Sequence, residues 1–352
     1  MHLLFALSIV TAALGTVPNG EPAHQPQLAV NGATVALTYG AGHAIYFSRS
    51  VDGGKSFAPA VQVAESPVLL LTRHRGPRVA FAGDAIVITA VTGKGGTTAG
   101  GAPSYAADLM AWRSSDGGKT WSQAVTINDA PGSSPEALHG LASDPKGRLF
   151  SVWLDNRAGK QRLYGALSTD AGRTWSKNTL VYASPDGTIC ECCHPSAAFD
   201  SAGNITVMFR NWLGGSRDLY LAQSKDGANF SRPRKLGEGT WKLNGCPMDG
   251  GGLAAGAGGI VTAWRREHSI FLDRPGEPER EIGAGTDVAI AAGAGGVYAI
   301  WSTPESIEMM APGETKGRAI GAKGTFPAVA ALAGGAVAAW ENAGKIVVGR
   351  VR

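Results

Sequence analysis

One motif of eight residues recurs along the first two thirds of the chain. It stands at 50–57, 114–121 and 168–175, and a form one residue shorter lies at 224–230. The shared pattern is Ser-x-Asp-x-Gly-x-Ser/Thr-Trp/Phe, and each copy lies between two strand-like runs. Asp and Ser side chains bond nearby backbone N–H groups and Gly adopts positive φ, so the motif predicts a hairpin turn. A chain that repeats this turn is expected to consist of similar β-hairpin units.

The motif resembles the Asp box of the sialidase-like (BNR repeat) β-propellers. The resemblance implies an all-β propeller in which each box joins two strands of a four-stranded blade. The aromatic residue that ends each box is expected to fold back over its hairpin and cover apolar surface. Composition agrees, because 50 of 352 residues are glycine and only 17% are charged, as many short strands joined by tight turns require.

An alternating run that often ends in Trp marks the second strand of each unit. Seven such runs occur at a spacing of about 30 to 50 residues, which is typical of propeller blades. We therefore predict seven blades, of which the last three lack the box. Six blades, the number in sialidases, remain an alternative if a terminal unit is shared in closing the ring. The runs lie at 34–39, 85–90, 148–153, 205–210, 259–264, 296–301 and 335–340.

The N-terminal residues 1–15 resemble a secretory signal peptide, with an apolar stretch followed by small residues. Its roughly 13 apolar residues are fewer than the ~20 needed to span a bilayer, so we expect an exported protein, periplasmic or secreted, without a membrane span in the mature chain. Residues 16–25 are predicted to be a flexible leader and residues 26–352 a single propeller domain. The net charge of +4 is spread along the chain and argues against a nucleic-acid partner.

Propeller geometry predicts which loops meet. In a blade that meanders outward, the turns between strands 1 and 2 and between strands 3 and 4, including the Asp boxes, share one face. The strand 2 to 3 turns and the links between blades share the other, which we call the link face. Arginine, aspartate, histidine and cysteine residues concentrate in the segments assigned to the link face. A binding site is therefore expected there.

The family resemblance also implies a reaction. Sialidases release terminal sialic acid with three arginines around the substrate carboxylate, a Tyr nucleophile paired with Glu, and an Asp acid/base. Arginine suits a carboxylate because its planar fork donates two charge-assisted hydrogen bonds. A glycan or another anionic small molecule is therefore the predicted partner. The candidate clamps are Arg73, Arg75, Arg157, Arg210, Arg217 and Arg265.

The rest of the sialidase set is incomplete in this chain. The family's Phe/Tyr-Arg-Ile-Pro segment is absent, and Tyr39 is the one tyrosine that we could nominate as nucleophile. The predicted function is thus a sialidase-type glycoside hydrolase or a glycan-binding protein. The candidate acids are Asp155 and Asp218, and the candidate bases are Glu267 and Glu136.

Two loops repeat one arrangement of Arg and Asp before a third strand, at 153–164 and 209–220. Such a pair could clamp a ligand, or it could only order the loop. We keep both alternatives. If Arg210 is a clamp, its replacement by Ala weakens binding and leaves the melting temperature unchanged, whereas a large fall in melting temperature indicates the loop-ordering role.

All four cysteines lie in two consecutive blade links, so we expect them to be close in space. Two disulfides are the expectation for an exported protein. A metal site is the alternative, since thiolates, an imidazole and a thioether suit copper, and Cys with His suits zinc. A mixed state with one disulfide and two free thiols is the third. The candidate ligands are Cys190, Cys192, Cys193, His194 and Cys246.

Two other classes of function therefore stand beside the carbohydrate-active one. The cysteine cluster would make the chain a periplasmic protein that binds copper or zinc. A flat propeller face could instead be a non-catalytic scaffold that docks another protein, and the fold alone does not separate these classes.

Overall fold

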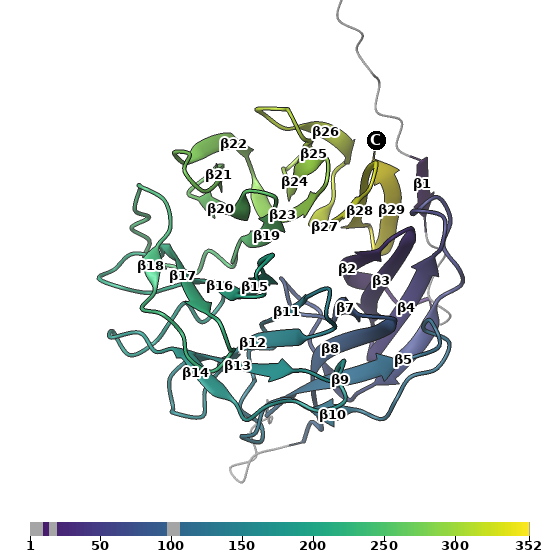
Figure 1. The fold of residues 1–352 in the computed structure, drawn as a ribbon, viewed down its shortest axis with the longest axis horizontal. Helices are drawn as coiled ribbons and strands as arrows, with labels where there is room; N and C mark the ends of the chain where they lie inside the picture. The colour runs from purple at the N-terminus through teal and green to yellow at the C-terminus, as the bar shows by residue number, and fades with distance from the viewer. Residues whose placement is uncertain (1–9, 14–19, 97–105, 352) are drawn as a thin grey trace, which may run out of the picture.

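The computed structural model describes residues 10–13, 20–96 and 106–351. Every regular element within them is a β-strand, and the strands form seven small sheets. Figure 1 shows these sheets arranged as blades around a central axis, in chain order from purple to yellow. The predicted all-β propeller is confirmed, and the blade count is seven rather than six.

Each of the first four blades begins with its innermost strand, next to the axis, and runs outward in sequence order. Blade 2 is irregular, because a short strand, β6, and the inner strand β7 pair with the same edge of β8. The strands are β2 (Ala23–Asn31), β3 (Thr34–Ala41), β4 (Ala44–Ser50) and β5 (Val61–Glu65) in blade 1; β6 (Val68–Leu69), β7 (Arg78–Ala82), β8 (Ala85–Gly93), β9 (Asp108–Ser114) and β10 (Val125–Thr126) in blade 2; β11 (His139–Ser143), β12 (Leu149–Asp155), β13 (Arg162–Ser168) and β14 (Thr179–Tyr182) in blade 3; and β15 (Ser196–Phe199), β16 (Ile205–Arg210), β17 (Leu219–Ser224) and β18 (Arg234–Lys235) in blade 4.

The last three blades have the same antiparallel order, and the seven predicted second-strand runs coincide with β3, β8, β12, β16, β20, β24 and β28. The strands are β19 (Gly252–Gly256), β20 (Gly259–Arg266), β21 (Ser269–Asp273) and β22 (Arg280–Ala284) in blade 5; β23 (Thr286–Gly293), β24 (Gly296–Ser302), β25 (Ser306–Met310) and β26 (Arg318–Ala322) in blade 6; and β27 (Thr325–Leu332), β28 (Gly335–Asn342) and β29 (Lys345–Val351) in blade 7.

The outermost strand of blade 7 comes from the other end of the chain. Strand β1 (Val10–Ala13) pairs antiparallel with β29, and Figure 1 shows the two strands side by side. β1 lies inside the predicted signal peptide, whose cleavage stays a prediction. The propeller itself begins at Ala23 in β2, slightly before the predicted boundary at residue 26.

The apolar core is divided into clusters that each lie between two neighbouring blades. Val87 of blade 2 packs with Trp153 of blade 3, for example, and Leu37 of blade 1 packs with Val337 of blade 7. The second contact closes the ring. Burial of these side chains is the main source of stability, so no blade is expected to be stable alone.

The four Asp boxes form the turns between strands 3 and 4, as predicted. In the second box Asp116 accepts hydrogen bonds from the hydroxyls of Ser114 and Thr120 and from the N–H groups of Lys119 and Thr120. Ser114 Oγ in turn accepts the N–H of Gly118. All of these bonds join residues within four positions of one another, which is why eight residues suffice to specify the turn.

Each box also packs against the preceding blade. Trp121 contacts Phe47 of blade 1 edge to face, with ring centroids 5.2 Å apart, and Phe230 lies 5.8 Å from Phe150 of blade 3. Gly118 has a φ of 87°, and a Cβ there would lie 2.0 Å from the ring of Phe47. The box aromatics therefore fill the space between blades, a wider role than the expected cover over their own hairpin.

The Asp boxes make the free energy of unfolding depend on pH in the acidic range. The Thr120 hydroxyl is the main cause that holds the pKa of Asp116 below its ordinary value, and Ser56 and Asn229 act in the same way on Asp52 and Asp226. A carboxyl group with a lower pKa in the folded than in the unfolded protein stabilises the fold above the unfolded pKa, about 4. We expect the free energy of unfolding to be insensitive to these groups from pH 7 to about 5, and to fall below about pH 4 as the unfolded chain takes up protons.

Denaturant unfolding at a series of pH values tests this expectation. Asp116→Asn removes one depressed group, so its stability should fall less steeply in acid than that of the wild type. An unchanged acid slope in this variant would contradict the role of the box carboxylate.

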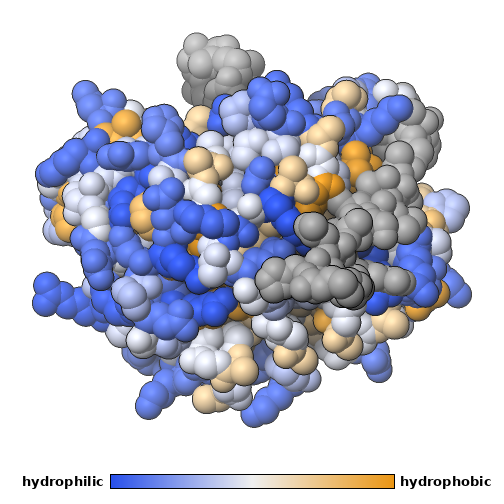
Figure 2. All heavy atoms as spheres, turned by 90° about the horizontal axis from the view of Figure 1, so that it is seen from above, coloured by the Kyte–Doolittle hydropathy of each residue, from blue (hydrophilic) through white to orange (hydrophobic). Residues whose placement is uncertain are grey.

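The outer surface carries few large apolar side chains. Figure 2 shows the ring from its edge, where hydrophilic side chains predominate and apolar ones are scattered. The large apolar residues exposed among those described are Val51, Val61 and Leu180. No helix in the described ranges has the length and apolarity to cross a bilayer. Docking of a protein partner stays a prediction.

Candidate functional site

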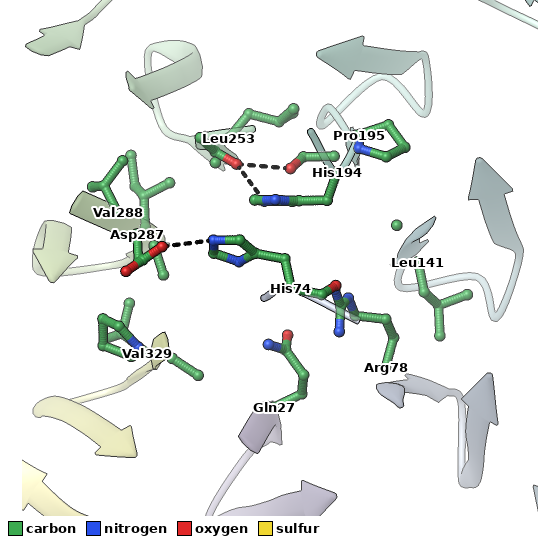
Figure 3. Close-up of a pocket in the computed structure, with 18 of the residues that line it drawn as sticks. Gln27, His74, Arg78, Leu141, His194, Pro195, Leu253, Asp287, Val288 and Val329 are labelled. Atoms are coloured by element: carbon green, nitrogen blue, oxygen red, sulfur yellow. Dashed lines mark hydrogen bonds and ion pairs between the residues drawn. The ribbon is translucent and has the colours of Figure 1, made fainter. Parts of the chain in front are cut away.

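A cavity of about 230 Å³ lies on the axis, where the inner strands begin. The inner strands follow the blade links, so this end of the axis belongs to the link face. Figure 3 shows polar side chains from four blades pointing into it. These side chains are Gln27 of blade 1, His74 and Arg78 of blade 2, His194 of blade 4 and Asp287 of blade 6.

A histidine and a carboxylate meet across this cavity. His74 Nε2 lies 2.8 Å from Asp287 Oδ1, and Figure 3 draws this contact as a dashed line. Since a carboxylate only accepts, the proton of this hydrogen bond is on His74 Nε2. No described residue is hydrogen-bonded to Nδ1, so this is the ring nitrogen of His74 that is left for a ligand. Asp287 is itself fixed by the Thr286 hydroxyl, 2.8 Å from Oδ2, and by Asp249, which accepts the N–H of Asp287.

A second histidine packs on the first. The ring of His194 stacks on His74 with centroids 4.2 Å apart, and its Nε2 donates to the carbonyl of Gly251 at 3.0 Å. Burial, followed by the positive charges of His74 and Arg78, lowers the pKa of His194 well below its ordinary value. His194 is therefore neutral at pH 7.

The charge of the Asp287 carboxylate is maintained in spite of burial. Burial alone raises the pKa of Asp287, but the hydrogen bond and charge of His74, with smaller effects of Thr286 and Arg73, outweigh it and lower the pKa below the ordinary value. Asp287 is thus ionised at neutral pH and can hold His74 in one tautomer and orientation, as an orienting carboxylate does in a catalytic His–Asp pair.

Arg78 contributes a buried positive charge to the wall. Its guanidinium donates to the carbonyls of His74 and Pro77 at 2.6 and 3.1 Å, and burial lowers its pKa to about 10. Arg78 therefore stays charged at pH 7.

None of the nine predicted catalytic and substrate-binding residues lines the cavity that the structure describes.

Sequence reasoning missed Gln27, His74, Arg78 and Asp287 as site residues. Gln27, Arg78 and Asp287 lie on inner strands, whereas His74 lies in the same blade link as the nominated Arg73 and Arg75. Asp287 is 6% exposed, and a charged residue buried to this extent needs a partner, but its burial follows from the fold and left no signal in the sequence.

The predicted acid Asp155 is completely buried and saturated with hydrogen bonds. It accepts from Ser133 Oγ at 2.8 Å, from Trp153 Nε1 at 2.9 Å, and from Arg157 through the backbone N–H, Nε and Nη2. Arg157 also pairs with Asp129 and stacks on Tyr164. These contacts favour the loop-ordering role for this Arg and Asp.

The second loop is built differently, although its sequence is similar. Asp218 is buried and accepts the N–H of Trp241, whereas Arg217 stacks on Trp212 and points its Nη1 at Cys190 Sγ, 3.3 Å away. Arg217 and Asp218 therefore contact different parts of the chain: Asp218 bonds the segment of Trp241, and Arg217 lies beside the cysteines.

Arg210 holds three chain segments together. It is 2% exposed, and its Nε, Nη1 and Nη2 atoms donate to the carbonyls of Asp249, Arg217 and Arg265. The guanidinium groups of Arg210 and Arg265 both lie over the ring of Trp241, 5.2 and 5.3 Å from its centroid. Every nitrogen of the Arg210 guanidinium group donates a hydrogen bond to a backbone carbonyl. These contacts favour the loop-ordering role for Arg210.

The remaining predicted residues lie apart from the cavity wall. Arg75 pairs with Glu136 at 3.0 Å, and Glu267 is an exposed turn residue whose carbonyl accepts from Arg265. Arg73 is exposed, and its positive charge acts on Asp287. Tyr39 is 2% exposed and stacked on Tyr46, and burial raises its pKa to about 12.

The four cysteines lie together on the link face, as expected. Cys192 and Cys246 form a disulfide that joins the links on either side of blade 4, and Cys190 and Cys193 are free and buried. The structure therefore has the third of the predicted states, with one disulfide and two free thiols. The Sγ atoms of Cys190, Cys192 and Cys193 lie within 4.8 Å of one another, and His194 is not part of this group. The five predicted metal ligands thus do not converge on one point.

The two free thiols are electrostatically unequal. The hydrogen bond between the two thiols, with smaller effects of Arg210 and Arg217, lowers the pKa of Cys190 to about 7 in spite of burial. Burial and the neighbouring Cys190 raise the pKa of Cys193. A surface pocket of about 180 Å³ adjoins the pair and is lined by Thr188, Ile189, Glu191, Trp212, Arg217 and Cys246.

Solved structures with a similar fold span nearly the whole chain. An α-L-arabinanase of Penicillium chrysogenum complexed with arabinobiose has a TM-score of 0.58 at 13% identity, with 98% of each chain covered. An ulvan lyase of polysaccharide lyase family PL25, bound to -[GlcA(1-4)Rha3S]-, has a TM-score of 0.59 at 12% identity, covering 98% of this chain and 96% of that one. An intramolecular trans-sialidase of Ruminococcus gnavus in complex with oseltamivir carboxylate has a TM-score of 0.54 at 11% identity, covering 96% and 97%.

The comparisons by sequence cover less of the chain than the comparisons by structure. No curated protein matches the chain. The family model described as BNR repeat-like domain matches residues 44–244, which is more than half of the chain and contains all four Asp boxes. By its sequence and its fold, the chain belongs to the BNR repeat-like domain family.

Proposed function

We propose that this propeller binds and acts on a carbohydrate with an acidic ring, which enters the axial cavity on the link face. The observation that carries the proposal is the hydrogen-bonded His74–Asp287 pair, whose free Nδ1 atom belongs to a residue of the cavity wall. In this arrangement His74 takes or gives the proton, and Asp287 positions it.

Size and charge support a single acidic ring. Cavities that hold drug-sized ligands are commonly about 300–1,000 Å³, so the axial cavity, at about 230 Å³, suits one ring better than an extended chain. Arg78 and the exposed Arg73 add positive charge near the entrance, which favours an anion. Gln27 offers both a donor and an acceptor for hydroxyl groups.

The comparisons support a carbohydrate as the ligand class. The similar structures include proteins complexed with arabinobiose, with a glucuronate-containing fragment and with oseltamivir carboxylate. The exo-sialidase reaction is the narrower form of the proposal. Its family pattern needs three arginines around one carboxylate, and Arg78 is the one arginine that lines the cavity as described, so we propose the wider class of acidic sugars and include sialosides in the test.

We also propose that the protein is exported. The disulfide between Cys192 and Cys246 supports it, because structural disulfides persist mainly in oxidising compartments. An extracellular or periplasmic protein would also meet polymeric sugars directly.

The test compares acidic with neutral sugars. Purified protein is titrated calorimetrically with sialic acid, glucuronic acid, galacturonic acid and arabinobiose, and assayed with a fluorogenic sialoside and with uronate polymers. We expect binding of at least one acidic sugar, and His74→Gln to lower turnover about 10²- to 10⁴-fold with little change in folding. Asp287→Asn should lower turnover in the same direction, because the amide no longer fixes the His74 tautomer.

His43→Gln is the matched control, since His43 is exposed in the β3–β4 turn of the same face and lies outside the cavity. Full turnover in His74→Gln would contradict the catalytic assignment. If no acidic sugar binds at millimolar concentration, or if only arabinobiose binds, the proposed ligand class is wrong.

A further inference from the structure

We propose that Cys190 and Cys193 form a binding site for one Cu(I) ion, separate from the carbohydrate site. The two free thiols lie with their Sγ atoms 2.8 Å apart and are almost fully buried, with 0% and 2% of their surfaces exposed. The neighbouring Cys192 is held in the disulfide and leaves these two sulfurs as the thiolate donors.

The donor set selects a soft metal. Met248, whose side chain carries a thioether, packs against the cysteine cluster, so sulfur is the soft donor that the neighbouring side chains offer. Thiolates and thioethers favour Cu(I), whereas Zn²⁺ in structural sites takes four ligands from Cys, His and carboxylates. The imidazole of His194 is turned to the axial cavity and bonded to the Gly251 carbonyl, so it does not complete a zinc site.

The surroundings compensate the charge of such a complex. Two thiolates on one Cu(I) carry one net negative charge, which is costly to bury without a partner. Arg217 Nη1 lies 3.3 Å from Cys190 Sγ and is held in place by stacking on Trp212. Arg210 acts electrostatically on both thiols and is fixed by its three carbonyl partners. Two rigid arginines therefore face the pair.

The disulfide and the adjoining pocket complete the site. Cys192 lies between the two ligands in the chain, and its bond to Cys246 anchors that segment to the next blade link. The pocket of about 180 Å³ lies beside the ligand pair, because it is lined by Arg217, which contacts Cys190, and by Cys246 of the disulfide.

Anaerobic titration with Cu(I) tests the proposal. Copper is kept reduced with ascorbate, which leaves disulfides intact, and the protein competes with the chelator bathocuproine disulfonate. We expect one Cu(I) per chain with a thiolate-to-copper charge-transfer band, and loss of both in Cys190→Ser and in Cys193→Ser. Arg217→Met should weaken Cu(I) binding about 10- to 100-fold, as loss of a hydrogen bond to a metal ligand does elsewhere.

Two further variants keep the test decisive if a cysteine variant misfolds. Met248→Leu should weaken Cu(I) binding, and Met110→Leu, a half-buried methionine of blade 2, should leave it unchanged. Removal of all copper from the wild type by the chelator would overturn the proposal. So would the mass of a chain with two disulfides in protein purified without a thiol reductant, because Cys190 and Cys193 would then be bonded to each other.

Discussion

Arg210→Ala is expected to lower the free energy of unfolding by about 3–5 kcal/mol. The variant leaves the carbonyls of Asp249, Arg217 and Arg265 without their donor, and each buried polar group without a partner costs about 1–3 kcal/mol. It also removes one of the two cations that lie over the ring of Trp241. Guanidinium unfolding followed by tryptophan fluorescence measures the change.

Arg173→Ala is the matched control, because Arg173 is an exposed arginine of the third Asp box and should change stability by less than about 0.5 kcal/mol. Arg210→Lys keeps the charge but not the fork, so its loss should lie between those of the two alanine variants. An unchanged stability in Arg210→Ala, together with weaker sugar binding, would restore the clamp alternative for this residue.

Asp155→Ala is expected to have a comparable effect, about 3–5 kcal/mol. The carboxylate is 0% exposed, and its removal leaves the Trp153 indole N–H and the Ser133 hydroxyl without an acceptor. It also takes from Arg157 its buried partner, and loss of one member of a buried ion pair typically costs 3–5 kcal/mol. Denaturant unfolding gives the magnitude.

Asp129→Ala provides the comparison, since Asp129 pairs with the same Arg157 but its side chain is 39% exposed. An exposed pair contributes about 0.2–1 kcal/mol, so this variant should be much milder. Loss of carbohydrate turnover in Asp155→Asn at unchanged stability would support Asp155 as the catalytic acid and contradict its structural role.

The loops that contain Asp155 and Arg210 show how similarity between two loop sequences can mislead. The phrases at 153–164 and 209–220 belong to one loop type, each with Arg and Asp before the third strand, and both suggested a ligand clamp. In the folded protein Arg157 bonds Asp155 within its own loop, whereas Arg217 turns to Cys190 in a different blade link. The difference arises from the neighbours that each loop meets, which the loop sequence does not contain.

The sequence by itself determined the repeating unit, the number of blades and the face on which the polar loops gather. It could do so because these features rest on local interactions: the hydrogen bonds of an Asp box join residues at most four positions apart, and strand alternation has a period of two. The proximity of the four cysteines followed from the same geometry.

The tertiary structure alone decided which residues meet at the axis and how the cysteines pair. His74 and Asp287 are 213 residues apart and lie in blades 2 and 6, and no local pattern relates them. Their contact exists because the ring closes through the packing of blade 7 on blade 1. In the same way, the choice of Cys246 for Cys192, which leaves Cys190 and Cys193 free, depends on the path of two links that only the closed propeller brings together.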